Sequence, residues 1–121
     1  MPSLREYSIC KVSTTTGVNM QAGAAATTLY TVPAGKTFYP VKVVIRNNSA
    51  SLANGTDYDF TTWEQNVSLT GMTVTTGFRV IQTTTNTTYT PIAAGGVFQI
   101  TPSTGCTAAC TVVIDVFGYL S

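Results

Sequence analysis

The five acidic side chains are the groups of this chain that could perform hydrolytic chemistry, and they are Glu6, Asp57, Asp59, Glu64 and Asp115. A glycosidase needs two opposed carboxylates, and one of the three central acids could face Asp115 across a groove. The chain contains no histidine, which is the usual general base of hydrolytic enzymes. Ser-His-Asp and Cys-His arrangements are therefore excluded. Because nothing else marks the acids as catalytic, we expect a protein that is not an enzyme.

Asp57 and Asp59, in the motif GTDYDF, are two residues apart and would share a face if both lay on a strand. They could then coordinate calcium together with loop carbonyl groups. The interpretation that we favour is that one carboxylate caps the preceding Asn-Gly turn and that the other pairs with Arg46 or Lys42. On this interpretation the pair is structural, and no metal or cofactor is expected.

Asp115 lies among apolar neighbours in the closing segment CTVVIDVFGYL. A buried carboxylate has to be paired or hydrogen-bonded, because an unpaired charge in an apolar environment is very costly. Arg46 and Arg79 are the expected partners. We therefore predict a structural ion pair at Asp115 and not a catalytic acid.

Three cysteines are the remaining candidates for metal binding. Cys106 and Cys110 are four residues apart in GCTAAC, and Cys10 stands alone. A zinc site would need Cys10 and a carboxylate as its third and fourth ligands, since histidine is absent. We expect reduced thiols that behave as small buried hydrophobic groups, with a disulfide between Cys106 and Cys110 as the alternative.

Three aromatic side chains that lie close together in the sequence could bind a partner, and they are Tyr58, Phe60 and Trp63. If exposed in a concave site, they would form a platform on which sugars stack. Tyr and Trp are also favoured in cores and in interfaces, so we expect these rings to anchor an interface or the core. Near the N-terminus, Tyr7 and Ile9 are expected to contact a neighbouring subunit.

The stretch LYTVPAGKTFYPVKVVIRN, residues 29–47, predicts a strand, a tight turn and a longer strand. The PAGK segment supplies the turn, because proline presets φ and glycine tolerates a positive φ. Alternation with a period of two directs one set of side chains into a core and leaves the other set partly exposed to water. The predicted core set is Tyr39, Val41, Val43 and Ile45, and the other set is Phe38, Lys42, Val44 and Arg46. Pro40 cannot donate a ladder hydrogen bond, so we expect an edge position or a bulge early in this strand.

About eight short segments of strand character, separated by Gly, Pro and Asn, predict an all-β fold, an antiparallel β-sandwich or barrel. Residues 110–120 are apolar on both faces, which indicates a central strand with the core on one side and a subunit interface on the other. We expect residues 27–121 to form the sandwich domain. Residues 1–26 are expected to form an extended N-terminal arm or an edge strand, and their second half shows no clear periodicity.

The composition favours a subunit of an assembly. Charged residues make up 9% of the 121 residues, the formal net charge is +1, and threonine is abundant. A free monomer generally needs more surface charge to stay soluble. The basic residues are scattered singly, so nucleic-acid binding is not expected. No apolar run is long enough to span a bilayer and the N-terminus lacks a hydrophobic signal segment, so we expect no membrane contact and synthesis in the cytoplasm.

Two segments, LYTVPAGKTFYPVKVVIRNNSASLANGTDYDF and the closing IDVFGYL, resemble small β-sandwich structural proteins of tailed bacteriophages. Among these proteins the chain is most similar to capsid decoration (cement) proteins. The resemblance implies a jelly-roll-like domain, often a homotrimer, on the outer surface of the virion, where it ties subunits of the major capsid protein together. It also implies capsid contacts by the N-terminal arm, and it transfers no catalytic residue.

A second role is open within the same group of phage proteins. A tail, fibre or spike module that binds host carbohydrate would need exposed rings at Tyr58, Phe60 and Trp63. For the decoration role, removal of residues 1–15 is expected to leave a folded sandwich and to weaken its attachment to the capsid.

Overall fold

Eight β-strands make up the part of the chain that the computed structural model describes, which comprises residues 9–61, 63–74, 77–82 and 91–121. In chain order the strands are β1 (Cys10–Asn19), β2 (Thr27–Thr31), β3 (Phe38–Arg46), β4 (Tyr58–Phe60), β5 (Glu64–Val67), β6 (Phe78–Gln82), β7 (Val97–Pro102) and β8 (Thr111–Leu120). The described residues contain no helix, and so none that is long and apolar enough to cross a membrane. The expected all-β class is confirmed.

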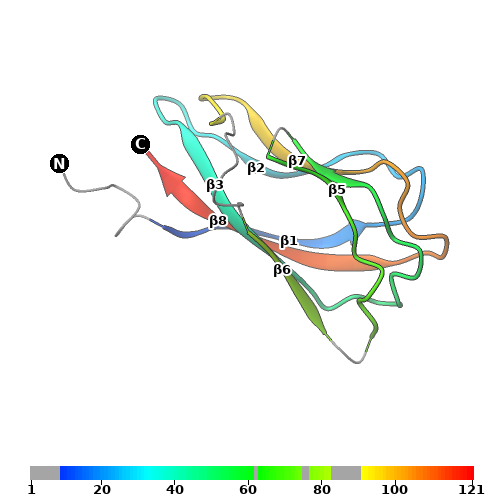
Figure 1. Cartoon of the computed structure of the whole chain (residues 1–121). Coiled ribbons are helices and arrows are strands. Elements are labelled where there is room, and N and C mark those ends of the chain that lie inside the picture. The colour runs from blue at the N-terminus through cyan, green and yellow to red at the C-terminus, as the bar shows by residue number, and fades with distance from the viewer. Residues whose placement is uncertain (1–8, 62, 75–76, 83–90) are drawn as a thin grey trace.

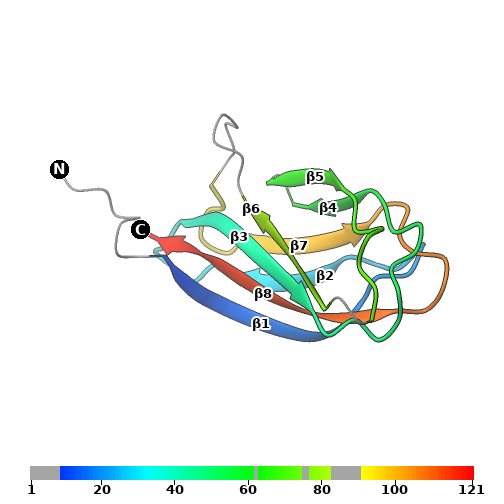
Figure 2. The ribbon, with the colours of Figure 1, turned by 60° about the horizontal axis from the view of Figure 1, so that its bottom comes forward.

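The strands form two four-stranded sheets with the orders β1-β8-β3-β6 and β2-β7-β4-β5. Every pair of neighbouring strands is antiparallel. The sheets lie in separate layers of a sandwich-like arrangement (Figure 1). Figure 2 shows β1, β8 and β3 side by side in the lower layer of the view, with β4, β5 and β7 above them.

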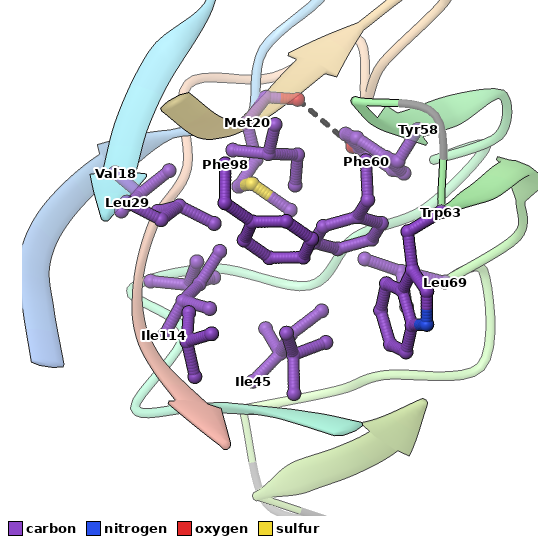
Figure 3. Packing of buried hydrophobic residues seen from close by; sticks show 14 of the residues in the cluster. Val18, Met20, Leu29, Ile45, Tyr58, Phe60, Trp63, Leu69, Phe98 and Ile114 are labelled. Atoms are coloured by element: carbon purple, nitrogen blue, oxygen red, sulfur yellow. Dashed lines mark hydrogen bonds between the residues drawn. The ribbon is translucent and has the colours of Figure 1, made fainter. Parts of the chain in front are cut away.

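The core between the layers is centred on aromatic rings. Phe98 of β7 lies 6.0 Å from Phe60 of β4, measured between ring centroids, and Trp63 lies within 5.8 Å of both rings. On the opposite sheet, Ile45 and Ile114 face these rings and are fully buried (Figure 3). The core is therefore built by side chains of both sheets, as the alternation of the strands predicted.

A β-bulge in β3 changes the predicted face of its first half. Pro40 pairs with Gly118 of β8 and Lys42 pairs with the preceding Phe117, so Val41 is an extra residue on β3. After the bulge the prediction for the core holds, but before it the inward residue is Phe38, which is fully buried, and Tyr39 points outward. The predicted bulge is thus confirmed, whereas the predicted faces of the two aromatic residues are wrong, because the extra residue reverses the alternation.

Strand β8 is central in its sheet, as its apolar character on both faces predicted. It pairs with β1 on one side and with β3 on the other.

Strand β1 lies at the edge of the sheet and continues to Asn19, through a segment whose sequence shows no period. Two register shifts of β1 against β8 explain this, because each shift changes which residues face the core. Residues 10–19 of the expected arm or edge strand therefore belong to the sheet, and residues 1–8 lie outside the described residues.

Candidate functional site

The three aromatic residues that were expected at an interface lie inside the domain. Tyr58 and Phe60 are fully buried, and Trp63 is 4% exposed. The Tyr58 hydroxyl donates a hydrogen bond of 2.8 Å to the carbonyl oxygen of Met20, which satisfies the polar end of the ring (Figure 3), and burial raises the pKa of Tyr58. Of the two expected alternatives, the core is therefore confirmed. An interface or a sugar platform at these residues is ruled out, because both need accessible rings.

Of the two N-terminal residues that were expected to contact a neighbouring subunit, the structure describes Ile9 but not Tyr7. Ile9 is 44% exposed and directly precedes β1. By the alternation of the strand, it lies on the same side of the sheet as Lys11. Tyr7 lies outside the described residues.

Two loop hydroxyl groups and one backbone N–H of β5 hold the carboxylates of Asp57 and Asp59. The Thr104 hydroxyl donates to Asp57 at 2.9 Å, whereas Asp59 accepts from the backbone N–H of Asn66 at 2.8 Å and from the Ser103 hydroxyl at 2.5 Å. The predicted ion pair with a basic residue of β3 is therefore wrong. Asp57 also precedes β4 with a φ of 57°, so the two acids do not share a strand face.

The thiols of Cys106 and Cys110 are separate and buried. The Cys106 thiol donates to the carbonyl oxygen of Met20 at 3.3 Å, and the Cys110 thiol donates to that of Ala50 at 3.3 Å. Burial raises the pKa of the Cys106 thiol, which disfavours the thiolate that acts as nucleophile and metal ligand. Cys10 lies apart and exposed, and the described ranges contain no group of three or more acids and cysteines that could hold a metal ion.

The side of sheet β1-β8-β3-β6 that points away from the core remains as the candidate site. Residues paired across antiparallel strands point to the same side of a sheet, so the register fixes which side chains share this surface. In four successive rows across the strands it comprises Tyr119 and Tyr39; Lys11, Phe117, Lys42 and Gln82; Thr14, Asp115, Val44 and Val80; and Val113, Arg46 and Phe78. We call this surface the outer face.

An ion pair occupies the middle of the outer face. Arg46 Nε donates to Asp115 Oδ2 at 2.7 Å, and the Thr14 hydroxyl donates to Asp115 Oδ1 at 2.7 Å. The hydrogen bonds from Arg46 are the main cause that lowers the pKa of the Asp115 carboxyl, against the opposing effect of burial. This confirms the predicted partner. Asp115 thus lies on a different sheet from Asp59 and Glu64, and Asp57 precedes a strand of that other sheet.

Aromatic side chains flank this ion pair. Tyr39 and Tyr119 stack with their centroids 4.8 Å apart and their planes 8° from parallel. In the next row the Lys42 ammonium group lies 4.8 Å from the centroid of the Phe117 ring, which is a cation–π contact. These contacts join side chains of β3 and β8 across the sheet and restrict their rotamers.

Two exposed apolar side chains lie on the same face, at the edge formed by β6. Phe78 is 63% exposed and Val80 is 39% exposed, both on β6 at the edge of the sheet. Together with Ile9 they are three of the four large hydrophobic side chains that the described part of the chain leaves exposed; the fourth is Val74. Phe78 and Val80 lie two residues apart on one face of β6, whereas Ile9 lies at the opposite edge of the sheet, before β1. Neighbouring exposed apolar residues are more typical of interaction surfaces than single ones, which need no explanation.

Comparisons of the chain with protein families, with curated proteins and with solved structures found no match. The outer face therefore has to be interpreted from its own residues. It combines Tyr, Phe and Arg, which are enriched in protein–protein interfaces, with Lys11 and Lys42, a residue type that is depleted there. The sequence pointed to this surface through the two apolar faces of residues 110–120, but it did not identify Tyr39 or Phe78, because their positions depend on the bulge and on the pairing of β6.

The ion pair gives the protein a specific pH dependence. Because Asp115 has a lowered pKa in the folded state, its contribution to stability is present above its ordinary pKa of 3.8 and is lost as the pH falls through the folded value. Replacing Asp115 by Asn is expected to cost about 1–2 kcal/mol at pH 7, a modest figure because water screens the half-exposed Arg46 side chain.

Thermal melts of both proteins between pH 7 and pH 2 would measure this effect. The difference in Tm between wild type and Asp115→Asn should shrink as the pH falls below about 4, since the wild-type carboxyl then loses its charge. A difference that stayed constant down to pH 2 would mean that the charge of Asp115 contributes nothing.

Proposed function

We propose that this chain is a structural protein of a tailed-phage virion, a capsid decoration protein with a jelly-roll domain that assembles on the outer surface of the head and binds the major capsid protein. In this role the outer face is a contact surface between protein subunits, and the chain performs no catalysis. The observation that carries the proposal is the combination of nested strand pairing with an ordered, aromatic outer face.

The order of strand pairing supports the jelly roll. The first strand pairs with the eighth, the second with the seventh, the third with the sixth and the fourth with the fifth. Successive pairs alternate between the two sheets. This nesting is what results when one long antiparallel ribbon folds over itself into a jelly roll, an architecture that recurs in viral capsid domains and in lectins.

The location of the phage-like segments supports the decoration role. The first segment, residues 29–60, comprises most of β2, all of β3 and all of β4, and the closing segment, residues 114–120, forms most of β8. Strands β3 and β8 are the central strands of the sheet that carries the outer face. Part of the phage-like sequence therefore builds the surface to which we assign subunit contacts, and the rest of it, in β2 and β4, belongs to the other sheet.

Quantitative mass spectrometry of purified virus particles tests the proposal. We expect about one copy of this protein per subunit of the major capsid protein, since symmetric shells repeat one contact at every equivalent position. A few copies to a few tens per particle would place the protein in the tail or a spike. Absence from particles would refute a virion role.

Attachment to capsids assembled without this protein tests the surface. Phe78→Ser, on the outer face, is expected to weaken attachment by about tenfold or more, because exposed aromatic anchors dominate binding energy. Val74→Ser is the matched control, since Val74 is 58% exposed but lies in no strand of the sheet. Equal attachment of the two variants would exclude the outer face from the contact.

A truncation can test the role of the N-terminal segment. Removal of residues 1–15 would delete more than half of β1, which pairs with β8 from Cys10 onwards, so that deletion is expected to destabilise the sheet. Removal of residues 1–8 leaves every described strand intact. If the segment contacts the capsid, this shorter deletion should leave the Tm unchanged and weaken attachment.

A further inference from the structure

Two lysines of the outer face have no ion-pair partner among the described residues. Lys11 of β1 and Lys42 of β3 are both paired with Phe117 of β8, so the three side chains form one row across the sheet, which we call the lysine row. The acid of this face, Asp115, is already paired with Arg46. The outer face therefore carries an excess of positive charge, and its own carboxylate does not neutralise the lysine row.

Two phenol groups lie next to the lysine row. The hydroxyl groups of Tyr39 and Tyr119 have no hydrogen-bond partner among the described residues, and the contact between these side chains is the stacking of their rings. Each hydroxyl can donate one hydrogen bond, and each ammonium group can donate three. This part of the surface therefore requires a partner that supplies acceptor oxygens.

The orientation of the rings indicates which acceptors fit. The centroids of Tyr39 and Tyr119 lie 4.8 Å apart, which is the spacing of neighbouring strands, and their planes are 8° from parallel. The two rings therefore stack along the direction that joins β3 to β8, and their rims point away from the sheet. The ammonium group of Lys42 covers a face of the Phe117 ring. Nucleic-acid bases stack on ring faces, whereas the rims carry positive partial charge and attract carboxylates.

Apolar area adjoins the lysine row at the edge of the sheet. Gln82 of β6 pairs with Lys42, and Val80 and Phe78 follow on the same side of that strand, where both are exposed. Buried apolar contacts here would contribute binding energy, while the charges would select the partner and fix its orientation. The surface thus fits a partner that presents carboxylates beside an apolar side chain.

Building on the proposed function, we infer that the outer face binds a segment of the major capsid protein that is rich in Asp and Glu. Its carboxylates pair with Lys11 and Lys42, and an apolar side chain of the segment packs against Phe78. A second copy placed face to face would bring the lysines of both copies together. The orientation of the rings disfavours a nucleic acid.

Crosslinking of virus particles with a water-soluble carbodiimide tests the inference directly. This reagent joins an amine to a carboxylate in contact with it, with loss of water and without a spacer. Mass spectrometry should identify Lys11 or Lys42 joined to Asp or Glu of the major capsid protein. Lys36, in the exposed turn before β3, is the internal control and should remain unlinked.

Neutral variants test the energetic role of the lysine row. Lys11→Gln with Lys42→Gln is expected to weaken attachment to capsids assembled without this protein by about tenfold or more, and to remove most of its dependence on salt. Lys36→Gln is the matched control and should attach like wild type. Circular dichroism verifies folding. If the double variant does not fold, Lys11→Gln alone replaces it, because Lys11 is exposed on the edge strand.

Fluorescence anisotropy with the purified protein separates the partner classes, with poly-L-glutamate and oligothymidylate of equal charge as probes. Tighter binding of polyglutamate, weakened in the double variant, supports the inference. Tighter binding of oligothymidylate, or lysine crosslinks to another copy of this chain, overturns it. If Phe78→Ser loses attachment while the double lysine variant keeps it, the inference alone is refuted. Polyglutamate binding by a protein that is absent from virus particles would refute the proposed function and leave the acidic chemistry of the partner standing.

Discussion

Replacing Phe60 by Ala is expected to lower the free energy of unfolding by about 3–5 kcal/mol. Phe60 is fully buried, and its ring lies within 6.0 Å of the rings of Phe98 and Trp63, measured between centroids. Alanine would remove the ring that joins these two neighbours and would leave a cavity that the surrounding strands can only partly fill. Since domains are typically stable by about 5–15 kcal/mol, the loss would be a large part of the total.

The matched control is Phe78→Ala. Phe78 is 63% exposed on β6, so its replacement should change the free energy of unfolding by about 0.5 kcal/mol or less. Thermal and urea unfolding of the two variants would measure the contrast, with a Tm lowered by roughly 12–20 °C for Phe60→Ala, at about 4 °C per kcal/mol. A Phe60→Ala variant as stable as the wild type would mean that the ring of Phe60 is not buried. The carbohydrate-binding alternative would then be open again.

The same contrast shows what the sequence could predict about the aromatic residues. Tyr58 and Phe60 are two residues apart, so a strand must point both to the same side. Which side that is depends on the pairing of β4 with β5 and β7, which no local pattern contains. The sequence therefore predicted the strand correctly, whereas the side of the strand that faces the core is determined only by its pairing within the sheet.

Strand β8 shows why other parts were predictable. Its apolar residues on both faces follow directly from a central position, and a single carboxylate among them requires a basic partner. Arg46 was one of the two candidates. Its neighbour Ile45 pairs with Ile114, the residue before Asp115, and this register places Arg46 beside the carboxylate. Burial and charge thus restricted the choice before the structure decided it.

Strand β3 shows the limit of such reasoning. Pro40 indicated a bulge, because proline cannot donate to the ladder, and the bulge is present. Its consequence could not be read from alternation alone, since Tyr39 and Phe38 have similar size and either could face the core. The deciding feature is the partner strand, where Gly118 leaves room for a ring.

Gly118→Ala is expected to lower the free energy of unfolding by about 3 kcal/mol. A Cβ atom at this position would overlap the carbonyl oxygen of Tyr39 and lie 2.5 Å from Cε1 of Phe38. Phe38 is fully buried, and its ring also contacts Phe98 at 6.0 Å between centroids. Neither the backbone oxygen nor the confined ring can move away without disturbing the bulge that sets the faces of β3.

Gly71→Ala is the matched control, because the nearest atom to its added Cβ is Nη2 of Arg79 at 3.2 Å, the end of a flexible side chain. Urea unfolding should show little change for that variant and a much lower midpoint for Gly118→Ala. If the two variants unfolded at the same urea concentration, the close packing of Phe38 on β8 would be refuted. If Gly118→Ala instead stayed stable but lost attachment to capsids, the added methyl group would have been accommodated by a shift of β3 that displaces Tyr39. The alternation set by the bulge would then determine the arrangement of the outer face.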